Sequence, residues 1–151
     1  MIGVKRYVVG FMFDTSLNWV VLIRKNRPVW QAGKLNGVGG KVEDNESPYA
    51  AMLREFCEET GMETSKWHLF LWYNYGDLGT PGSLGEIYFY WTIGDVTKAR
   101  SVTDEQVEVM EIDQLSNHKE TIPNIRWLVQ MARSFSFGER ATYFDMQERT
   151  W

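Results

Sequence analysis

The chain is 151 residues long, with 16 Lys and Arg against 20 Asp and Glu and a formal net charge of -4. That length fits a single domain over residues 1–151. A hydrophobic fraction of 44% with only 4 Pro fits a globular chain rather than a disordered one. The acid excess argues against a nucleic-acid polymer or an anionic membrane as partner, because proteins that bind them carry a basic excess. A small anionic ligand stays compatible, since its site needs only a few local cations.

The cysteine content and the apolar runs bear on the compartment. The single cysteine, Cys57, excludes an intrachain disulfide. Lys5 and Arg6 precede the apolar run 7–13 as in a signal peptide, but the run is short and Asp14 ends it, which favours a strand. No apolar run approaches the roughly 20 residues of a membrane helix. We therefore expect a soluble, cytoplasmic protein with no membrane partner.

The first predicted elements are two strands, 4–13 and 19–24, rich in Val, Ile and aromatic residues and separated by a turn at 14–18. Residues 26–40 are predicted to be irregular, because they contain a proline and four glycines.

A helix is predicted next. Ser47 suits the N-cap, Pro48 suits the first helical position, and Gly61 can end the helix in the left-handed conformation. Apolar residues recur at helical spacing. They predict a buried face made of Tyr49, Leu53, Phe56 and Cys57.

The remaining elements alternate strand and helix patterns, which favours an α/β fold with a mixed sheet covered by helices on its faces. In chain order they are strands at 67–75, 86–96 and 107–112, a helix at 124–135 that buries Ile125, Leu128, Val129 and Ala132, and a short strand at 142–146. A glycine-rich loop at 76–85 joins the first two of these strands.

Three acids, Glu55, Glu58 and Glu59, share one face of the first predicted helix. Their mutual repulsion costs a few tenths of a kcal/mol per pair even in water. The last two also lie where the helix dipole disfavours negative charge. A solvated acidic face is the ordinary explanation of such a pattern. A hard divalent cation would offset both costs, whereas His68 and His118 are too far apart in sequence to favour zinc.

The residues around these acids follow a fixed spacing. Over 40–62 this spacing resembles the signature of the Nudix hydrolases, which include the MutT-like pyrophosphohydrolases. It consists of Gly40, five residues, Glu46, seven residues, Arg54-Glu55, Phe56, Cys57, Glu58-Glu59, Thr60, Gly61 and Met62. The resemblance implies a Nudix-type α/β/α sandwich with a catalytic loop–helix–loop and a requirement for Mg²⁺ or Mn²⁺.

The resemblance also assigns roles to individual residues. Glu55, Glu58 and Glu59 would bind the metal, with Glu55 also a candidate general base. The carbonyl of Gly39 would be a further ligand, and Gly40 would allow a sharp loop entry. Arg54 would be catalytically important by forking to carboxylates such as Glu46 or Glu55.

Members of the family often use a fourth acid from a later loop. Glu108 is our first candidate and Glu105 our second, and either could equally be an ordinary charge at a strand edge. No spacing rule fixes the position of this loop.

The implied reaction is attack of water on a phosphorus of a nucleoside diphosphate linked to another group, most simply a nucleoside triphosphate that yields monophosphate and pyrophosphate. Asn36 matches an amide of the MutT-like branch that acts on oxidised purine triphosphates, although Asn is also a common turn residue. Asn124 offers a second amide. Arg24 and Lys41, with nearby Lys25, Arg27 and Lys34, could contact phosphates or be solvated loop cations, and Trp30 or Trp127 could stack a base.

Other substrates and functions stay open. ADP-ribose is the leading alternative substrate because Pro81 lies in the appropriate region, and a dinucleoside polyphosphate is another. In a different class, the chain could be a nucleotide-sensing module without turnover. The sequence also leaves open whether two copies form a homodimer.

Overall fold

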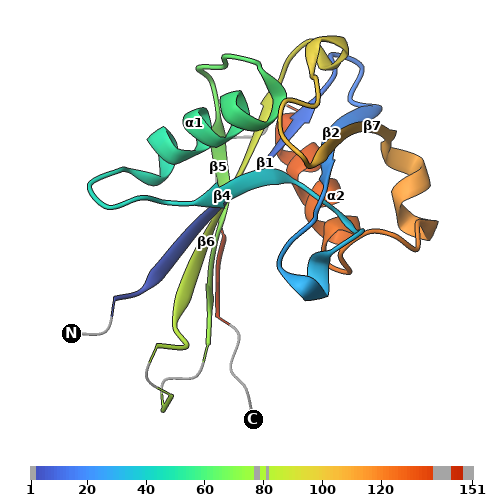
Figure 1. Ribbon diagram of the computed structural model, residues 1–151. Helices are drawn as coiled ribbons and strands as arrows, with labels where there is room; N and C mark the ends of the chain where they lie inside the picture. Colours follow the sequence, from blue (N-terminus) through green and yellow to red (C-terminus); the bar gives the residue numbers. More distant parts are fainter. Residues whose placement is uncertain (1–2, 77–78, 81, 138–143, 148–151) are drawn as a thin grey trace.

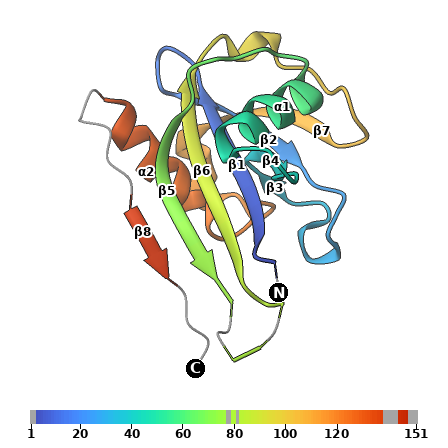
Figure 2. The same ribbon diagram turned by 90° about the vertical axis from the view of Figure 1, so that its left-hand side faces the viewer.

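The computed structural model describes residues 3–76, 79–80, 82–137 and 144–147, without the side chains of 144–147. In these residues a mixed, open sheet runs between two helices (Figures 1 and 2). The strands are β1 (Lys5–Phe13), β2 (Trp19–Arg24), β3 (Leu35–Asn36), β4 (Val38–Lys41), β5 (His68–Tyr75), β6 (Gly85–Ile93), β7 (Gln106–Glu111) and β8 (Phe144–Gln147). The helices are α1 (Pro48–Thr60) and α2 (Ile125–Ser136), and short 3₁₀ helices lie at η1 (Val29–Gln31), η2 (Val96–Lys98) and η3 (Ile112–Asn117).

The central strand of the sheet is β1, and its neighbours set the layout. The strand order is β3-β2-β1-β6-β5-β8, with β4 pairing to β1 and β7 to β2. The β1–β6 pair is parallel and the β5–β6 pair is antiparallel. The strands β5 and β6 form a long hairpin, in which β6 is paired with β1 over its whole length (Figure 2). The predicted mixed sheet with helices on both faces is confirmed.

Successive side chains along the strands lie alternately in two separate hydrophobic cores. In β2, Val20 and Leu22 lie in the core under α2, whereas Val21 and Ile23 lie in the core under α1. The alternation follows from the two-residue period of a strand. All four residues predicted for the buried face of α2 are buried there: Ile125, Leu128, Val129 and Ala132.

The ends of α1 match the prediction. The Ser47 hydroxyl accepts a hydrogen bond from the Ala50 N–H at 3.1 Å, and Gly61 has φ +73°. The predicted buried face is partly wrong, because Tyr49 is 38% exposed, with its hydroxyl donating to the Ser65 carbonyl, and Cys57 is only half-buried. Phe56 is buried and Leu53 packs at the margin of the core. The helix is rotated so that its buried stripe is Ala51, Met52, Phe56 and Thr60.

Two predicted boundaries are corrected. Residues 26–40 are not all irregular, because they contain η1, β3 and most of β4. The strand predicted at 86–96 ends at Ile93, since Asp95 caps η2. The short strand predicted at 142–146 is found at Phe144–Gln147, and residues 142–143 lie outside the described part, as do 77–78 and 81 of the glycine-rich loop.

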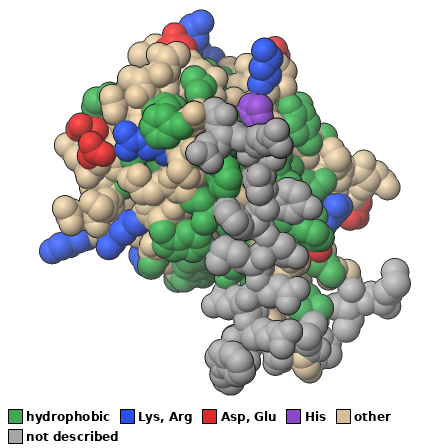
Figure 3. Space-filling view, turned by 180° about the vertical axis from the view of Figure 1, so that it is seen from behind, with side chains coloured by type: hydrophobic (Ala, Val, Ile, Leu, Met, Phe, Trp, Pro, Cys, Tyr) green, Lys and Arg blue, Asp and Glu red, His purple; other side chains and the backbone are tan. Residues whose placement is uncertain are grey.

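None of the helices in the described residues has the length and apolar character needed to cross a membrane. The face seen from behind carries acidic and basic side chains scattered among hydrophobic ones (Figure 3). The described residues visible there show no second concentration of acids like that of α1.

Candidate active site

The entry to α1 brings the β4 glycines against the helix. Pairing of β4 with β1 sets Gly39 opposite Val9 and Gly40 opposite Val8. The Glu55 carboxylate lies directly over Gly40, where a Cβ atom would overlap it. Only 12% of the Glu55 side chain is exposed. A glycine at position 40 is therefore required for Glu55 to reach the floor of the site.

Arg54 connects the acids of the loop and the helix. Its guanidinium makes a two-point contact with Glu46, at 2.8 Å from Nε to Oε2 and 2.9 Å from Nη2 to Oε1. Nη1 donates to Glu55 at 2.9 Å and to Glu58 at 3.2 Å, and Nη2 also donates to the Lys41 carbonyl. The hydrogen bonds to Glu46 are the main reason that the pKa of Arg54 is raised. Because the fork is planar and rigid, it fixes the relative positions of these carboxylates.

The charged forms of the α1 carboxylates are disfavoured by their surroundings, as the sequence suggests. Burial raises the pKa of Glu55, against the lowering effect of Arg54, and the charges of Glu58 and Glu59 raise it further. Burial also raises the pKa of Glu59, partly offset by a hydrogen bond from the Thr103 hydroxyl at 2.9 Å. Negative charge on this face is therefore costly and would be relieved by a cation.

Of the two candidates for a fourth acid, Glu105 is the one that lies near α1. It is 5% exposed and accepts hydrogen bonds from Lys25 Nζ at 3.0 Å and from the Asn26 N–H. The Thr103 hydroxyl accepts from the Glu105 N–H and donates to Glu59. The charge of Glu105 also contributes to the raised pKa of Glu59.

Glu108 lies on the other face of the sheet. Its β-ladder partner is Leu22, which belongs to the core under α2, while its neighbours Val107 and Val109 pack against the core under α1. The Glu108 carboxylate is bound by Arg24, with 3.1 Å between Nη2 and Oε1. The structure therefore brings Glu105, and not Glu108, toward the α1 carboxylates. Because β7 begins at Gln106, its alternation sets the face of Glu108, whereas Glu105 lies in the bend before the strand.

The predicted phosphate-binding cations differ in availability. Arg24 is already engaged by Glu108, by the Gly33 carbonyl at 2.8 Å and by Glu120 at 3.1 Å. Lys41 is exposed at the end of β4, one residue after Gly40. The Lys41 side chain is open to solvent on the opposite face of β4 from Gly40, whereas Arg24 is held in a structural network.

The two predicted amides lie on segments that are paired through their backbones. The Leu35 N–H donates to the Glu120 carbonyl at 2.7 Å, and the Ile122 N–H donates to the Leu35 carbonyl at 3.0 Å. This pairing places Asn36 beside the segment that leads into Asn124. The Oδ1 atom of Asn124 is buried and has no hydrogen-bond donor among the described residues.

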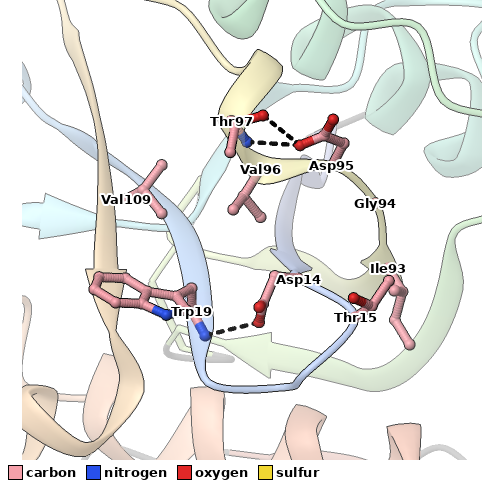
Figure 4. Close-up of a pocket in the computed structure, with 9 residues that line it drawn as sticks. All are labelled: Asp14, Thr15, Trp19, Ile93, Gly94, Asp95, Val96, Thr97 and Val109. Atoms are coloured by element: carbon pink, nitrogen blue, oxygen red, sulfur yellow. Dashed lines mark hydrogen bonds between the residues drawn. The ribbon is translucent and has the colours of Figure 1, made fainter.

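A separate cavity of about 680 Å³ lies near the opposite end of β7 (Figure 4). Val109, in its wall, is four residues along the strand from Glu105, or about 13 Å. The cavity is lined by two carboxylates, and both accept hydrogen bonds within turns: Asp14 from the Trp19 N–H and Asp95 from the Thr97 N–H. Both carboxylates of this cavity are therefore held by local turn hydrogen bonds.

The side chains of α1 that could bind a metal have the donor atoms that a hard metal ion prefers. Its side-chain donors are all carboxylate oxygens, which Mg²⁺ and Mn²⁺ prefer. As arranged, no three acidic, imidazole or thiol side chains of the described residues converge closely enough to hold a metal. Glu55 and Glu58 are turned toward Arg54, and Glu59 toward Thr103. Glu55 is three residues from Glu58 and four from Glu59, the two spacings that place side chains on one helix face.

Several solved structures share this fold. The mutator MutT protein of Bacillus halodurans superposes with a TM-score of 0.71 at 19% identity, over 97% of this chain and 91% of that one. A MutT NUDIX hydrolase of Burkholderia pseudomallei gives 0.69 at 20% identity, over 85% and 98%. The NUDIX domain of Shewanella oneidensis NrtR, solved with ADP ribose, gives 0.69 at 14% identity, over 89% of each chain.

At the level of sequence, no curated protein matches this chain significantly. The model of the NUDIX domain matches residues 4–130, a range that contains the whole acidic signature of α1 and both candidates for the fourth acid. With most of its length matched by that model, the chain belongs to the Nudix family of hydrolases.

Proposed function

We propose that this Nudix hydrolase cleaves a phosphoanhydride bond of a nucleoside triphosphate, releasing a nucleoside monophosphate and pyrophosphate, with Mg²⁺ or Mn²⁺ as its cofactor. Nudix hydrolases generally use divalent metal ions. The observation that carries the proposal is the acidic face of α1, which carries Glu55, Glu58 and Glu59 and on which the Glu55 carboxylate lies over Gly40.

Glu55, Glu58, Glu59 and the Gly39 carbonyl are the proposed metal ligands. When bound, the metal would neutralise phosphate charge and lower the pKa of a water molecule. We assign the part of general base to Glu55, because Arg54 holds its carboxylate in place over Gly40 at the floor of the site.

In the proposed step, the water oxygen forms a bond to one phosphorus and the bond from that phosphorus to the bridging oxygen breaks. The proton of the water goes to the Glu55 carboxylate, and the electron pair of the broken bond leaves on pyrophosphate. Arg54 acts without touching the substrate, by holding Glu55 and Glu46 in place.

We propose Glu105 in place of Glu108 as the fourth acid. Replacement Glu105→Gln keeps an oxygen for only one of its two donors, Lys25 Nζ or the Asn26 N–H, and removes the charge next to Glu59. We expect it to lower kcat at least tenfold and to raise the Mg²⁺ concentration needed for half-maximal rate. Glu108→Gln is expected to leave both within about twofold, and the reverse order of effects would reject the assignment.

The proposed function is tested with a panel of dNTPs, oxidised dGTP, ADP-ribose and dinucleoside polyphosphates in Mg²⁺, with product identification by chromatography. We expect metal-dependent release of pyrophosphate from at least one triphosphate, absent in the Glu58→Gln/Glu59→Gln variant. If no compound gives product above that control, the chain is not an enzyme of this kind.

Two other outcomes would each assign the chain a different function. The NrtR domain that shares this fold was solved with ADP ribose, and cleavage of ADP-ribose alone would make that compound the substrate. Nucleotide binding without turnover and without dependence on Mg²⁺, measured by calorimetry, would make the chain a sensing module.

A homodimer also stays a prediction, checked by the mass of the protein in solution.

A further inference from the structure

The segment between η2 and β7 is fixed against the end of α1. The Arg100 N–H donates at 3.0 Å to the carbonyl of Thr60, the last residue of α1. The Val107 N–H donates to the Ser101 hydroxyl at 2.9 Å. Residues 103–105 form a bend between these two contacts. The position of the bend relative to α1 is therefore set by hydrogen bonds on both sides of it.

The same bend is held by the loop that follows β2. Glu105 is buried and accepts hydrogen bonds from Lys25 Nζ and from the Asn26 N–H. The side-chain amide of Asn26 donates to the Asp104 carbonyl at 2.9 Å, and Arg27 forms an ion pair with the Asp104 carboxylate. A side chain on this bend is thus presented from a fixed backbone.

Thr103, the first residue of the bend, contacts two of the acids of the proposed site. Its hydroxyl oxygen accepts a hydrogen bond from the Glu105 N–H at 3.2 Å and lies 2.9 Å from Glu59 Oε2. A peptide N–H can only donate and a carboxylate can only accept, so the single hydroxyl proton points to Glu59. Thr103 is therefore a hydrogen-bond donor toward Glu59.

Glu59 is the acid of α1 that Arg54 does not hold. Arg54 donates to Glu55 and to Glu58. Within the described part of the chain, the side-chain hydrogen bond to Glu59 comes from Thr103 and reaches Oε2. The second oxygen, Oε1, accepts no hydrogen bond from these residues. That oxygen is thus available to a cation while Thr103 holds the other one.

Glu59 and Glu105 repel each other when no cation is bound. Burial raises the pKa of Glu59, and the charge of Glu105 raises it further. Because a glutamate side chain has several rotatable bonds, this repulsion alone would turn Glu59 away from Glu105. The hydrogen bond from Thr103 opposes that rotation, and it is strengthened by the charge of its acceptor.

We infer that Thr103 is a positioning residue for the metal centre, and that its hydroxyl holds Glu59 beside Glu105 before a metal ion binds. A metal ligand that is already in place has less freedom to lose on binding. Removal of the partner that orients such a ligand typically weakens metal binding roughly 10–100-fold. The inference rests on the metal ligands of the proposed function, but it concerns affinity for the metal and not the substrate or the chemical step.

The test measures the dissociation constant of Mn²⁺ without nucleotide, by electron paramagnetic resonance of the free ion. Only binding that is lost in the Glu58→Gln/Glu59→Gln variant counts as binding at α1. Thr103→Val removes the hydroxyl and keeps the shape of the side chain, and we expect it to raise the dissociation constant at least about fivefold. Thr103→Ser keeps the hydroxyl and should stay within about twofold of the wild type.

The matched control is Thr97→Val. The Thr97 hydroxyl also donates to a carboxylate, that of Asp95 at the start of η2. This variant therefore loses the same kind of hydrogen bond without changing a contact of the α1 acids, and it should bind Mn²⁺ as the wild type does. Similar urea midpoints of the three variants in EDTA will show that each protein folds.

The rate of hydrolysis gives a second readout. At limiting Mg²⁺, Thr103→Val should hydrolyse the best triphosphate of the panel more slowly than the wild type. At saturating Mg²⁺ the difference should shrink to about twofold or less, because the lost affinity is then compensated by mass action. A rate that stays low at saturating Mg²⁺ would mean that Thr103 acts on the chemical step, which would overturn the inference.

The outcomes separate the inference from the proposed function. Unchanged or tighter Mn²⁺ binding by Thr103→Val would overturn the inference, and tighter binding would show that the hydroxyl holds Glu59 away from the metal. Equal weakening in Thr103→Ser would also overturn it, because the hydroxyl is then not the cause. None of these results concerns the proposed function, which fails if a wild-type protein that binds Mn²⁺ hydrolyses no member of the panel. A wild-type protein that binds no Mn²⁺ at α1 would reject both.

Discussion

Gly40 illustrates how a single residue sets the position of a reactive group. Its missing side chain is the space in which the Glu55 carboxylate lies. Gly39, one residue earlier, is small for a different reason, since a Cβ atom there would overlap the backbone carbonyl of Val8. A carboxylate can rotate away from an added methyl group, whereas a carbonyl within the sheet cannot.

The two alanine variants should therefore fail in different ways. Gly40→Ala is expected to fold, because Glu55 can turn aside, but to lose at least tenfold in kcat through the misplaced carboxylate. Gly39→Ala is expected to lower the urea midpoint of unfolding strongly, because β4 must separate from β1. Equal losses of stability in the two variants would contradict this account of the glycines.

Glu59 gives a prediction on pH. Burial raises its pKa, so its favourable contribution to folding is present below the pKa of the unfolded state and is lost as the pH rises through the folded value. At neutral pH without divalent metal, the charge of Glu59 therefore destabilises the fold. We expect Glu59→Gln to raise the urea midpoint at pH 7.5 in EDTA, and the gain to disappear near pH 4.

The control for this variant is Glu63→Gln, an exposed position that changes the net charge equally. It should give no pH-dependent difference from the wild type. A Glu59→Gln variant that is less stable than the wild type at pH 7.5 would show that the hydrogen bond from Thr103 outweighs the burial of the charge.

Among the elements, the loop between β4 and α1 is held to the helix by the hydrogen bonds of Arg54. About a quarter of its side chain is exposed. It makes five hydrogen bonds, to Glu46, Glu55, Glu58 and the Lys41 carbonyl. We expect Arg54→Met to cost about 1–2 kcal/mol in the free energy of unfolding and to lower kcat, because hydrogen bonds to charged groups contribute that much when partly shielded from water.

The comparison variant is Arg27→Met. Arg27 also pairs with an acid, Asp104, but 66% of each side chain is exposed. Such pairs contribute little in water, so its midpoint in urea denaturation should not move measurably. Similar midpoints for both variants would mean that the hydrogen bonds of Arg54 do not stabilise the fold.

The sequence predicted elements best where a local cause determines them. The ends of α1 follow from the Ser47 cap and the left-handed Gly61. The strand β4 escaped prediction because its glycines resemble a loop, and the reason for those glycines, close approach to Val8 and Glu55, is a tertiary contact. The strand β3 has only two residues, Leu35 and Asn36, too few for a strand pattern. The rotation of α1 that leaves Tyr49 exposed is likewise set by packing against the sheet.

The same limit applies to the site. The signature predicts which acids lie on α1, because helix spacing alone puts them on one face. Alignment could not choose between Glu105 and Glu108. The alternation of β7 turns Glu108 away from α1, whereas the position of Glu105 depends on the bend before the strand and on its contacts with Lys25 and Asn26. The hydrogen bond from Asn36 to Gln31 could not be predicted either, because it depends on the path of the η1 loop.

At the scale of the whole molecule, the net charge of -4 is unevenly distributed. Residues 43–59 contain six of the 20 acids and one basic residue, Arg54, a larger acid excess than that of the entire chain. Such a segment repels phosphate unless cations are bound. The acid excess that argues against polyanionic polymers is, on this account, the place where a small polyphosphate binds together with metal.

The most direct measurement is therefore the initial rate of pyrophosphate release from the best triphosphate of the panel as a function of Mg²⁺ concentration. We predict no release in EDTA, a saturable rise with Mg²⁺ in the wild-type protein, and a rate at least a hundredfold lower at every Mg²⁺ concentration in Glu58→Gln/Glu59→Gln. Release of pyrophosphate in EDTA, or undiminished release by the double variant, would contradict the assignment of the α1 carboxylates as the metal-binding centre of this hydrolase.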